Sequence, residues 1–267
     1  MSIPRIIPFL AALSVVWLSP GDAAAEPAPK LVAGSTFTVT FAEMPPTFFN
    51  LTHPDQKTPA QMTVFLPRNY SADRKFPLLV FLEGGDGGDG THLGVARALC
   101  EGKDFVCLGV PLFRTGDPHA PGKYVLREPD GRFMWPYFRT MLAKLDTQVT
   151  NLDSAHQILC GFSNGAHAIA ALIDGSEGEV ARRFSAIGFV EGGGHLEHYE
   201  QLKGKPFLMV SSQPGSKRRA LEILDAAKVA GAVGTFVFQD VGQHDFPQAA
   251  YPAVREWLRG EAAAPRY

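Results

Sequence analysis

Three side chains in this sequence have the types and the order that nucleophilic catalysis requires: Ser163, His244 and Glu191. A serine hydroxyl attacks a carbonyl group when a base removes its proton, and the base needs an acid that orients it. Ser163 lies between two glycines in the pattern G-x-S-x-G, over residues 161–165. This pattern is typical of a sharp strand-to-helix turn that exposes the serine hydroxyl.

The residues on either side of this turn fit the strand and the helix that the pattern predicts. Residues 158–160 form a short apolar run, as expected for a buried parallel strand. After the turn, one face of the predicted helix is apolar, at Ala166, Ile169, Ala170 and Ile173. We therefore expect a strained backbone at Ser163 and free N–H groups of the helix start near its hydroxyl. The alternative is an ordinary turn in which the serine caps the helix.

His244 is the candidate base, because no other histidine follows the last predicted strand, residues 235–238. The order of a serine first and a histidine last is that of one large class of serine hydrolases. Among the remaining histidines, we expect His167 to pack rather than react, and His195 could line the pocket. The others are expected to be surface or packing residues: His53, His92, His119, His156 and His198.

The acid of the triad is less evident from the sequence. Its usual position follows the penultimate predicted strand, but residues 211–216 contain no carboxylate. Glu191 stands at the end of the strand before that one, directly before three glycines, where it could reach the histidine. We predict that Glu191 is the acid. Asp240 and Asp245, beside the histidine, are the alternatives.

An oxyanion hole requires two N–H donors close to the nucleophile. One is expected from Asn164, the residue after the serine. The other is expected from the glycine-rich loop 83–88, which follows a predicted buried strand, and we favour Gly85 over its neighbours Gly84 and Asp86. Glycines let the backbone approach the substrate oxygen closely.

Acidic residues in the same region bear on the ligand. Glu83, Asp86 and Asp89 would repel phosphate, and no lysine follows, so a phosphate-binding loop fits poorly. A calcium site built from these acids is an alternative, although the spacing does not match an EF-hand. Their negative charge favours a neutral acyl or sugar ester as substrate. Glu83, together with Trp135 from the long segment 111–135, is a candidate substrate contact.

The elements that must position these residues alternate along the chain as strand and helix after two early strands. This order predicts an α/β protein with a mainly parallel sheet covered by helices on both faces. In such sheets the site lies beyond the carboxyl ends of the strands. The predicted strands are residues 36–41, 62–66, 77–82, 105–110, 158–160, 186–190, 207–210 and 235–238; the predicted helices are 92–99, one beginning near Pro136, 166–173, 220–229 and 254–258.

The first 25 residues have the features of a secretory signal peptide. Arg5 precedes an apolar run over residues 6–18, and alanines 23–25 form a cleavage site. We expect a single domain over residues 26–267 that is exported to a periplasm or to the medium. No later segment is long and apolar enough for a membrane helix. The net charge of −2 gives no footprint for nucleic acid.

The three cysteines leave at least one thiol unpaired. Cys107 and Cys160 lie in apolar runs and are expected to be buried. Cys100 could form a small disulfide loop with Cys107. No cysteine or histidine spacing indicates a metal site, and no cofactor is expected.

Residues 161–165 and His244 resemble the α/β-hydrolase superfamily of serine esterases over roughly residues 60–260. Within it, the layout is similar to the secreted branch of feruloyl and acetylxylan esterases and polyhydroxybutyrate depolymerases. Two departures are Glu83, where that family often has histidine, and the missing acid in residues 211–216. The resemblance implies the α/β-hydrolase fold and hydrolysis of a small-molecule or polymer ester through an acyl-enzyme. A serine peptidase and a non-catalytic binding protein on the same fold are the rival hypotheses.

Overall fold

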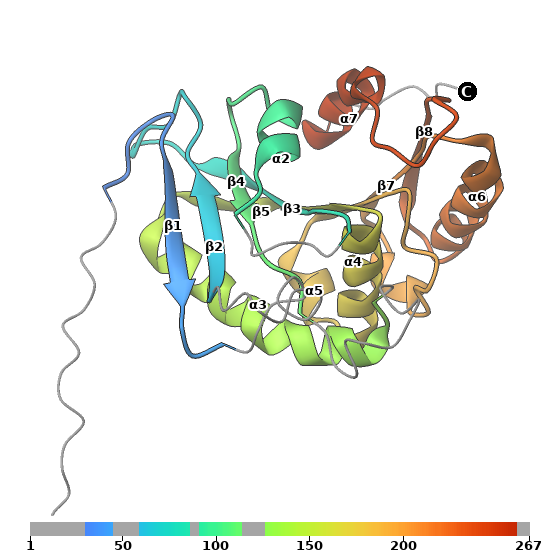
Figure 1. Cartoon of the computed structure of the whole chain (residues 1–267), viewed down its shortest axis with the longest axis horizontal. Helices are drawn as coiled ribbons and strands as arrows, with labels where there is room; N and C mark the ends of the chain where they lie inside the picture. Colours follow the sequence, from blue (N-terminus) through green and yellow to red (C-terminus); the bar gives the residue numbers. More distant parts are fainter. Residues whose placement is uncertain (1–29, 45–58, 86–90, 114–125, 261–267) are drawn as a thin grey trace, which may run out of the picture.

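The computed structural model describes residues 30–44, 59–85, 91–113 and 126–260, so the predicted signal peptide lies outside the described residues. An eight-stranded sheet forms its centre, in the order β1-β2-β4-β3-β5-β6-β7-β8 (Figure 1). The strands are β1 (Thr36–Phe41), β2 (Ala60–Phe65), β3 (Phe76–Leu82), β4 (Val106–Gly109), β5 (Leu152–Phe162), β6 (Ala186–Val190), β7 (Pro206–Ser211) and β8 (Val233–Phe238).

The sheet is parallel from β4 to β8. Strands β1 and β2 pair antiparallel, and β2 also runs antiparallel to β4. The prediction of a mainly parallel sheet is therefore confirmed. Because parallel strands end at the same edge, the segments that follow β3, β5, β6 and β7 meet there.

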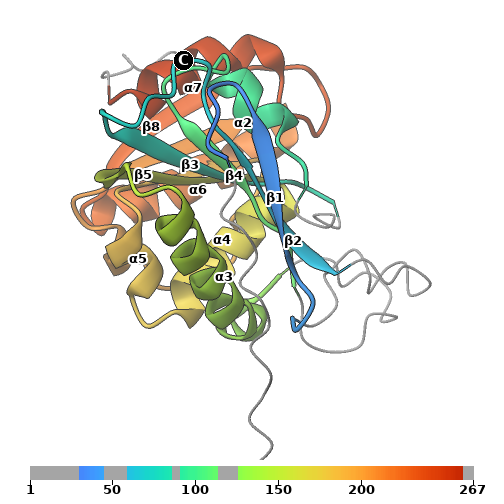
Figure 2. The same cartoon turned by 90° about the vertical axis from the view of Figure 1, so that its left-hand side faces the viewer.

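Helices cover both faces of this sheet (Figures 1 and 2). One face carries α2 (Gly94–Leu99) and α7 (Tyr251–Leu258). The other carries α3 (Glu128–Gln148), α4 (Asn164–Gly175), α5 (Glu179–Arg183) and α6 (Pro214–Val229). Two short 3₁₀ turns are Tyr199–Leu202 and Gln248–Ala250. Strand β3 serves both cores, since Val80 packs toward α3 and Phe81 toward α7.

Two helices begin earlier than the sequence predicts. Helix α3 begins at Glu128, and Pro136 lies inside it rather than near its start. Pro129, in the first turn of α3, occupies the position where proline is favoured in helices. Helix α6 begins at Pro214 rather than at Ala220. The sequence pattern missed this start because the first turns of the helix are polar and exposed and so have no apolar face.

The three cysteines are all buried and all unpaired, so Cys100 and Cys107 do not form the disulfide that the sequence suggested. All three thiols lie in the core beneath α2 and α7. Burial raises the pKa of the Cys160 thiol, which keeps it protonated. Within the described ranges, no helix has the length and apolar character needed to cross a membrane.

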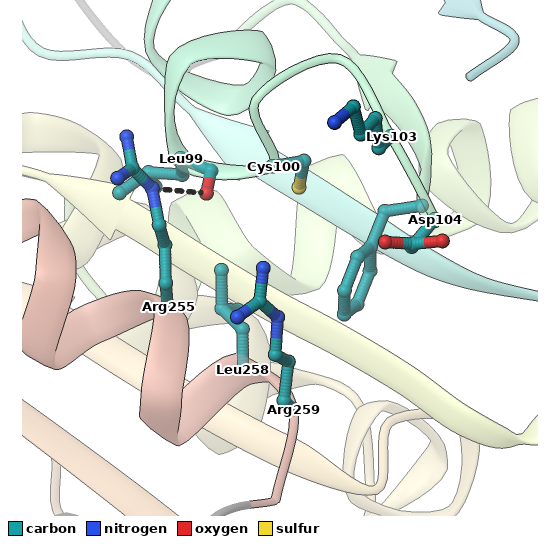
Figure 3. A pocket seen from close by; sticks show the side chains of 8 residues that line it. Leu99, Cys100, Lys103, Asp104, Arg255, Leu258 and Arg259 are labelled. Atoms are coloured by element: carbon teal, nitrogen blue, oxygen red, sulfur yellow. Dashed lines mark hydrogen bonds between the residues drawn. The ribbon is translucent and has the colours of Figure 1, made fainter. Parts of the chain in front are cut away.

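Helix α7 is fixed to both α2 and β5, and this anchors the chain just after His244. Figure 3 shows Arg255 beside the end of α2, where its Nε donates to the Leu99 carbonyl at 3.0 Å. A second guanidinium nitrogen donates to the Ala98 carbonyl at 3.0 Å. On the other side, a ring nitrogen of His156 lies 2.9 Å from the Leu258 carbonyl. The loop between β8 and α7 therefore has a firmly held far end.

The two glycines of G-x-S-x-G allow β5 and α4 to approach closely. A Cβ at Gly161 would lie 2.5 Å from the Gly165 carbonyl carbon, and one at Gly165 would lie 2.0 Å from the Leu82 carbonyl oxygen. Backbone atoms cannot move aside as a flexible side chain can. A side chain at either position would therefore clash with backbone, which explains why both positions are glycine.

We expect Gly165→Ala to lower the free energy of unfolding by roughly 1–3 kcal/mol, because the new methyl group forces α4 away from the end of β3. Urea unfolding followed by circular dichroism measures this. Gly94→Ala is the matched control, since a Cβ at this first position of α2 meets nothing within 4 Å. Equal stability of the two variants would contradict the packing argument.

Candidate active site

Ser163 joins β5 to α4 in a strained backbone conformation, with φ 53° and ψ −116°. This region is costly for a residue other than glycine and is found where the surrounding structure enforces it. Ser163 occupies the N-cap position of α4, but its hydroxyl makes no cap hydrogen bond. The hydroxyl lies instead 2.8 Å from Nε2 of His244. The alternative of a helix-capping serine is therefore wrong.

His244 lies between the serine and an acid. Its Nε2 faces the Ser163 hydroxyl, and its Nδ1 lies 3.3 Å from Oε2 of Glu191. The ring of Phe162 stacks on the imidazole, with centroids 5.2 Å apart. The His244 side chain is 46% exposed, so one edge of the imidazole remains open to an approaching molecule. The three side chains form one hydrogen-bonded chain.

Glu191 is held as a buried anion at the end of β6. Its side chain is 1% exposed, and its backbone has φ 52°. Burial acts to raise the pKa of its carboxyl group, but hydrogen bonds from Ser212 and Ser216 lower it more, so that the pKa lies below its usual value. The Oε1 atom accepts the N–H of Ser212 and the Ser216 hydroxyl, the latter at 2.8 Å. A negative charge therefore faces the imidazole.

The two alternative acids are engaged elsewhere. Oδ1 of Asp240 accepts the N–H of Gly242 at 2.9 Å, and Oδ1 of Asp245 accepts the N–H of Phe246 at 2.7 Å. Both carboxylates stabilise the turn on which the histidine sits. The structure thus brings Glu191, rather than either aspartate, to the imidazole.

The serines after β7 are functional candidates that sequence reasoning missed. In addition to holding Glu191, Ser212 donates its hydroxyl to the Gln243 carbonyl at 2.8 Å and accepts the N–H of Asp245 at 3.1 Å. Ser212 therefore fixes the residues on both sides of His244. The loop contains no carboxylate, and a carboxylate is what the pattern of a catalytic triad requires there. The available signal was a pair of serines at a buried strand end, with Ser216 shortly after them.

The predicted oxyanion residues lie next to each other. The Asn164 side-chain amide donates to the Gly85 carbonyl at 2.6 Å. A Cβ at Gly84 would lie 3.2 Å from that of Ser163, so the loop passes beside the nucleophile. The first backbone bond of α4 runs from the His167 N–H to the Ser163 carbonyl, at 3.1 Å. The N–H of Asn164 precedes this bond and has no partner within the helix.

The two predicted substrate contacts have different outcomes. Trp135 is 7% exposed, belongs to the same core cluster as Val80 and Leu172, and donates its indole N–H to Glu179 at 2.9 Å. It belongs to the core beneath α3, so its assignment to a substrate wall is wrong. The error came from treating this part of α3 as loop.

Glu83, directly after β3, is half-buried, and its role as a substrate contact stays a prediction. Burial raises the pKa of its carboxyl group, while His92 acts in the opposite direction. Asp86 and Asp89 lie outside the described residues. Among the residues that are described, no group of three or more His, Cys, Asp or Glu side chains could hold a metal ion.

A histidine pair lies beside the triad. The ring of His167, one turn after Ser163, packs on that of His195, with centroids 5.3 Å apart. Nδ1 of His195 lies 2.6 Å from a guanidinium nitrogen of Arg127. Burial, followed by the charges of His195, Arg127 and His244, lowers the pKa of His167 to about 4. His167 is therefore neutral at ordinary pH.

This lowered pKa makes a prediction about stability. Between the native value of about 4 and the ordinary value of 6.5, the unfolded chain binds more protons at His167 than the native chain. The free energy of unfolding therefore falls as the pH is lowered through this window. In His167→Gln we expect a smaller fall, measured by urea unfolding at several pH values. His198→Gln, at a half-exposed imidazole, is the control. An unchanged pH dependence in His167→Gln would contradict this account.

No protein-family model and no curated protein sequence matches this chain. Solved structures do match it. A ferulic acid esterase superposes with a TM-score of 0.58 at 14% sequence identity, over 86% of this chain and 98% of that one. The chain has the α/β-hydrolase fold.

Other α/β-hydrolases superpose with similar quality. The Bacillus cereus carboxylesterase is 19% identical, with a TM-score of 0.54 over 72% of this chain and 92% of that one. The AtxE2 isopeptidase is 14% identical, with a TM-score of 0.51 over 84% of this chain and 40% of that one. Esters and peptide-type bonds are thus both represented among proteins that share this α/β-hydrolase architecture, and the fold alone does not choose between them.

Proposed function

We propose that this protein is a serine esterase that hydrolyses carboxylic esters through an acyl-enzyme on Ser163. The observation that carries the proposal is the hydrogen-bonded chain from Ser163 through His244 to the buried carboxylate of Glu191. A serine at the N-cap position whose hydroxyl faces an imidazole, and makes no cap hydrogen bond, is arranged as a nucleophile. Ferulic acid esterase and carboxylesterase neighbours support ester hydrolysis as the reaction.

Each residue has a role in this mechanism. The Ser163 hydroxyl attacks the ester carbonyl while Nε2 of His244 accepts its proton. Glu191 orients the imidazole through Nδ1–H and stabilises the imidazolium. The N–H groups of Asn164 and Gly85 hold the oxyanion. The imidazolium then protonates the leaving alcohol, and a water molecule activated by the same histidine releases the acid.

The finer parts of the proposal concern substrate and location. The resemblance to feruloyl and acetylxylan esterases and polyhydroxybutyrate depolymerases favours an acyl or sugar ester, as a small molecule or on a polymer. The acidic loop taken alone favours a neutral substrate, and esters that differ in charge test this. Residues 1–25 favour export to a periplasm or to the medium.

Labelling with a fluorophosphonate probe tests the proposed nucleophile. We expect the purified protein to be labelled and Ser163→Ala not to be. Ser35→Ala, which removes an exposed hydroxyl before β1, should be labelled like the parent. Absence of labelling in the parent would favour a non-catalytic binding protein. If the parent is labelled but cleaves a matched anilide faster than the ester, the protein is a peptidase rather than an esterase.

A further inference from the structure

Two arginines from different helices converge on the turn that follows Glu191. Arg127 stands at the N-terminus of α3, and its guanidinium lies 2.6 Å from Nδ1 of His195. Arg219, from α6, donates to the Gly194 carbonyl at 2.6 Å. Like charges gathered at one turn repel each other, and they are stabilised when an anion lies between them.

The imidazole at the centre of this group adds no charge of its own. Burial, and then the charges of Arg127 and Arg219, lower the pKa of His195. His195 therefore accepts a hydrogen bond from Arg127 at Nδ1 and carries its proton on Nε2. The cluster Arg127–His195–Arg219 consequently offers N–H donors and positive charge to one region of space.

The carboxylates nearby are engaged with other partners. Glu191 is bonded to Ser212, Ser216 and His244. Asp174 accepts the N–H groups of Glu197 and His198. Glu222 lies 3.2 Å from Arg219, but it is half-exposed, so solvent weakens this pair. Arg127 instead directs its guanidinium to a neutral ring.

A cavity of about 170 Å³ lies beside this cluster, between α4, α6 and the turn after β6. Arg219 and His167 line it, and so does Glu191, the acid of the triad. Its apolar lining comes from Met209, Val210, Ala220 and Ile223. The turn is made of glycines, and a Cβ at Gly192 would already lie 2.5 Å from the Ser163 carbonyl oxygen. The cavity has room for a small organic group, and of the three residues of the cluster it is Arg219 that reaches its wall.

We propose that the Arg127–His195–Arg219 cluster binds a carboxylate carried by the substrate, so that the preferred ester bears a free carboxylate on its acyl or its alcohol side. This rests on the proposed esterase function. It replaces the expectation of a neutral substrate, which depended on Glu83 and on Asp86 and Asp89. Arginine suits the task, because its planar fork matches a carboxylate in two hydrogen bonds.

Pairs of esters that match in size and differ in charge, one with a carboxylate and one with an amide, test the proposal. On the alcohol side, 4-acetoxybenzoate is compared with 4-acetoxybenzamide. On the acyl side, monomethyl adipate is compared with methyl adipamate. We expect kcat/KM for the anionic member of at least one pair to exceed that of its amide by about tenfold, as for a hydrogen bond to a charged group. Added salt should reduce this preference.

Substitution then locates the preference. We expect Arg127→Gln and Arg219→Gln each to lower the ratio of anionic to amide kcat/KM, mainly through KM. Arg218→Gln is the matched control, because Arg218 is the neighbouring residue of α6, is 91% exposed, and carries the same charge. The ratio should be unchanged in Arg218→Gln. Equal loss in all three variants would mean a general effect of net charge and would overturn the proposal.

Binding to Ser163→Ala separates this proposal from the esterase proposal. Calorimetry with the same four esters should show tighter binding of the anionic member of the preferred pair, whether or not the parent is a catalyst. Suppose that the parent has no esterase activity but Ser163→Ala still binds the anionic member more tightly. The proposed function would then be wrong, and the proposed carboxylate site would stand. If the parent is active but the ratio of anionic to amide kcat/KM is near one in both pairs, the proposed function would stand and the proposed carboxylate site would be overturned.

Discussion

Replacing Ser163 with alanine is expected to lower kcat for any ester substrate on the order of 10⁶-fold, because the triad then has no nucleophile to form the acyl-enzyme. The His244 base and the oxyanion donors would remain, but they could only assist direct attack by water. The removed hydroxyl bonds to His244 and does not cap α4, so its loss should leave the fold intact.

The measurement is single-turnover and steady-state hydrolysis of a short-chain aryl ester, with folding checked by circular dichroism. The Ser35→Ala variant controls for the loss of a hydroxyl elsewhere. A Ser163→Ala variant that retained a substantial fraction of the parental kcat would show that the reaction does not pass through this serine, and the acyl-enzyme mechanism would have to be abandoned.

The second large effect is expected from Glu191→Gln, which should lower kcat by about 10⁴-fold. The amide keeps the size of the buried side chain but removes the negative charge that faces Nδ1 of His244. An amide N–H directed at this nitrogen would also favour the tautomer whose proton sits on Nε2, where the serine proton must arrive. Both changes disable the base without moving it.

Asp240→Asn and Asp245→Asn are the controls for this experiment, because they remove a carboxylate close to the same histidine. Each carboxylate accepts a local backbone N–H, and an amide oxygen can accept the same bond. We expect both variants to keep most of the parental activity. A larger loss in either aspartate variant than in Glu191→Gln would transfer the role of the acid to that aspartate.

The parts of the site that could be predicted are those that depend on a short contiguous pattern or on the order of elements along the chain. Residues 161–165 form a sharp turn for which the two glycines leave room, and the positive φ of Ser163 follows from that turn. The position of His244 after the last strand follows from the alternation of strands and helices. The parallel sheet followed from apolar runs such as residues 77–82, which alternate with predicted helices.

The parts that the sequence did not predict depend on contacts between distant segments. The roles of Ser212 and Ser216 after β7 become evident only once β6 lies beside β7 and presents Glu191 to them. Trp135 looked like a surface aromatic because the start of α3 at Glu128 was not recognised. The convergence of Arg127 and Arg219, which are far apart in the chain, is likewise a product of packing and leaves no periodic trace in the sequence.

The position of His244 after an edge strand has a consequence for how the protein would lose activity. Within the described part of the chain, strand β8 pairs with β7 alone, and the segment around His244 is tied to the rest of the sheet through the Ser212 hydroxyl and through backbone bonds to Ser211 and Ser212. Edge units open more readily than a central strand such as β5, in subglobal fluctuations that leave the rest folded. Such an opening would withdraw the base while Ser163 and Glu191 stay in place, so inactivation can precede global unfolding and can reverse without refolding of the core.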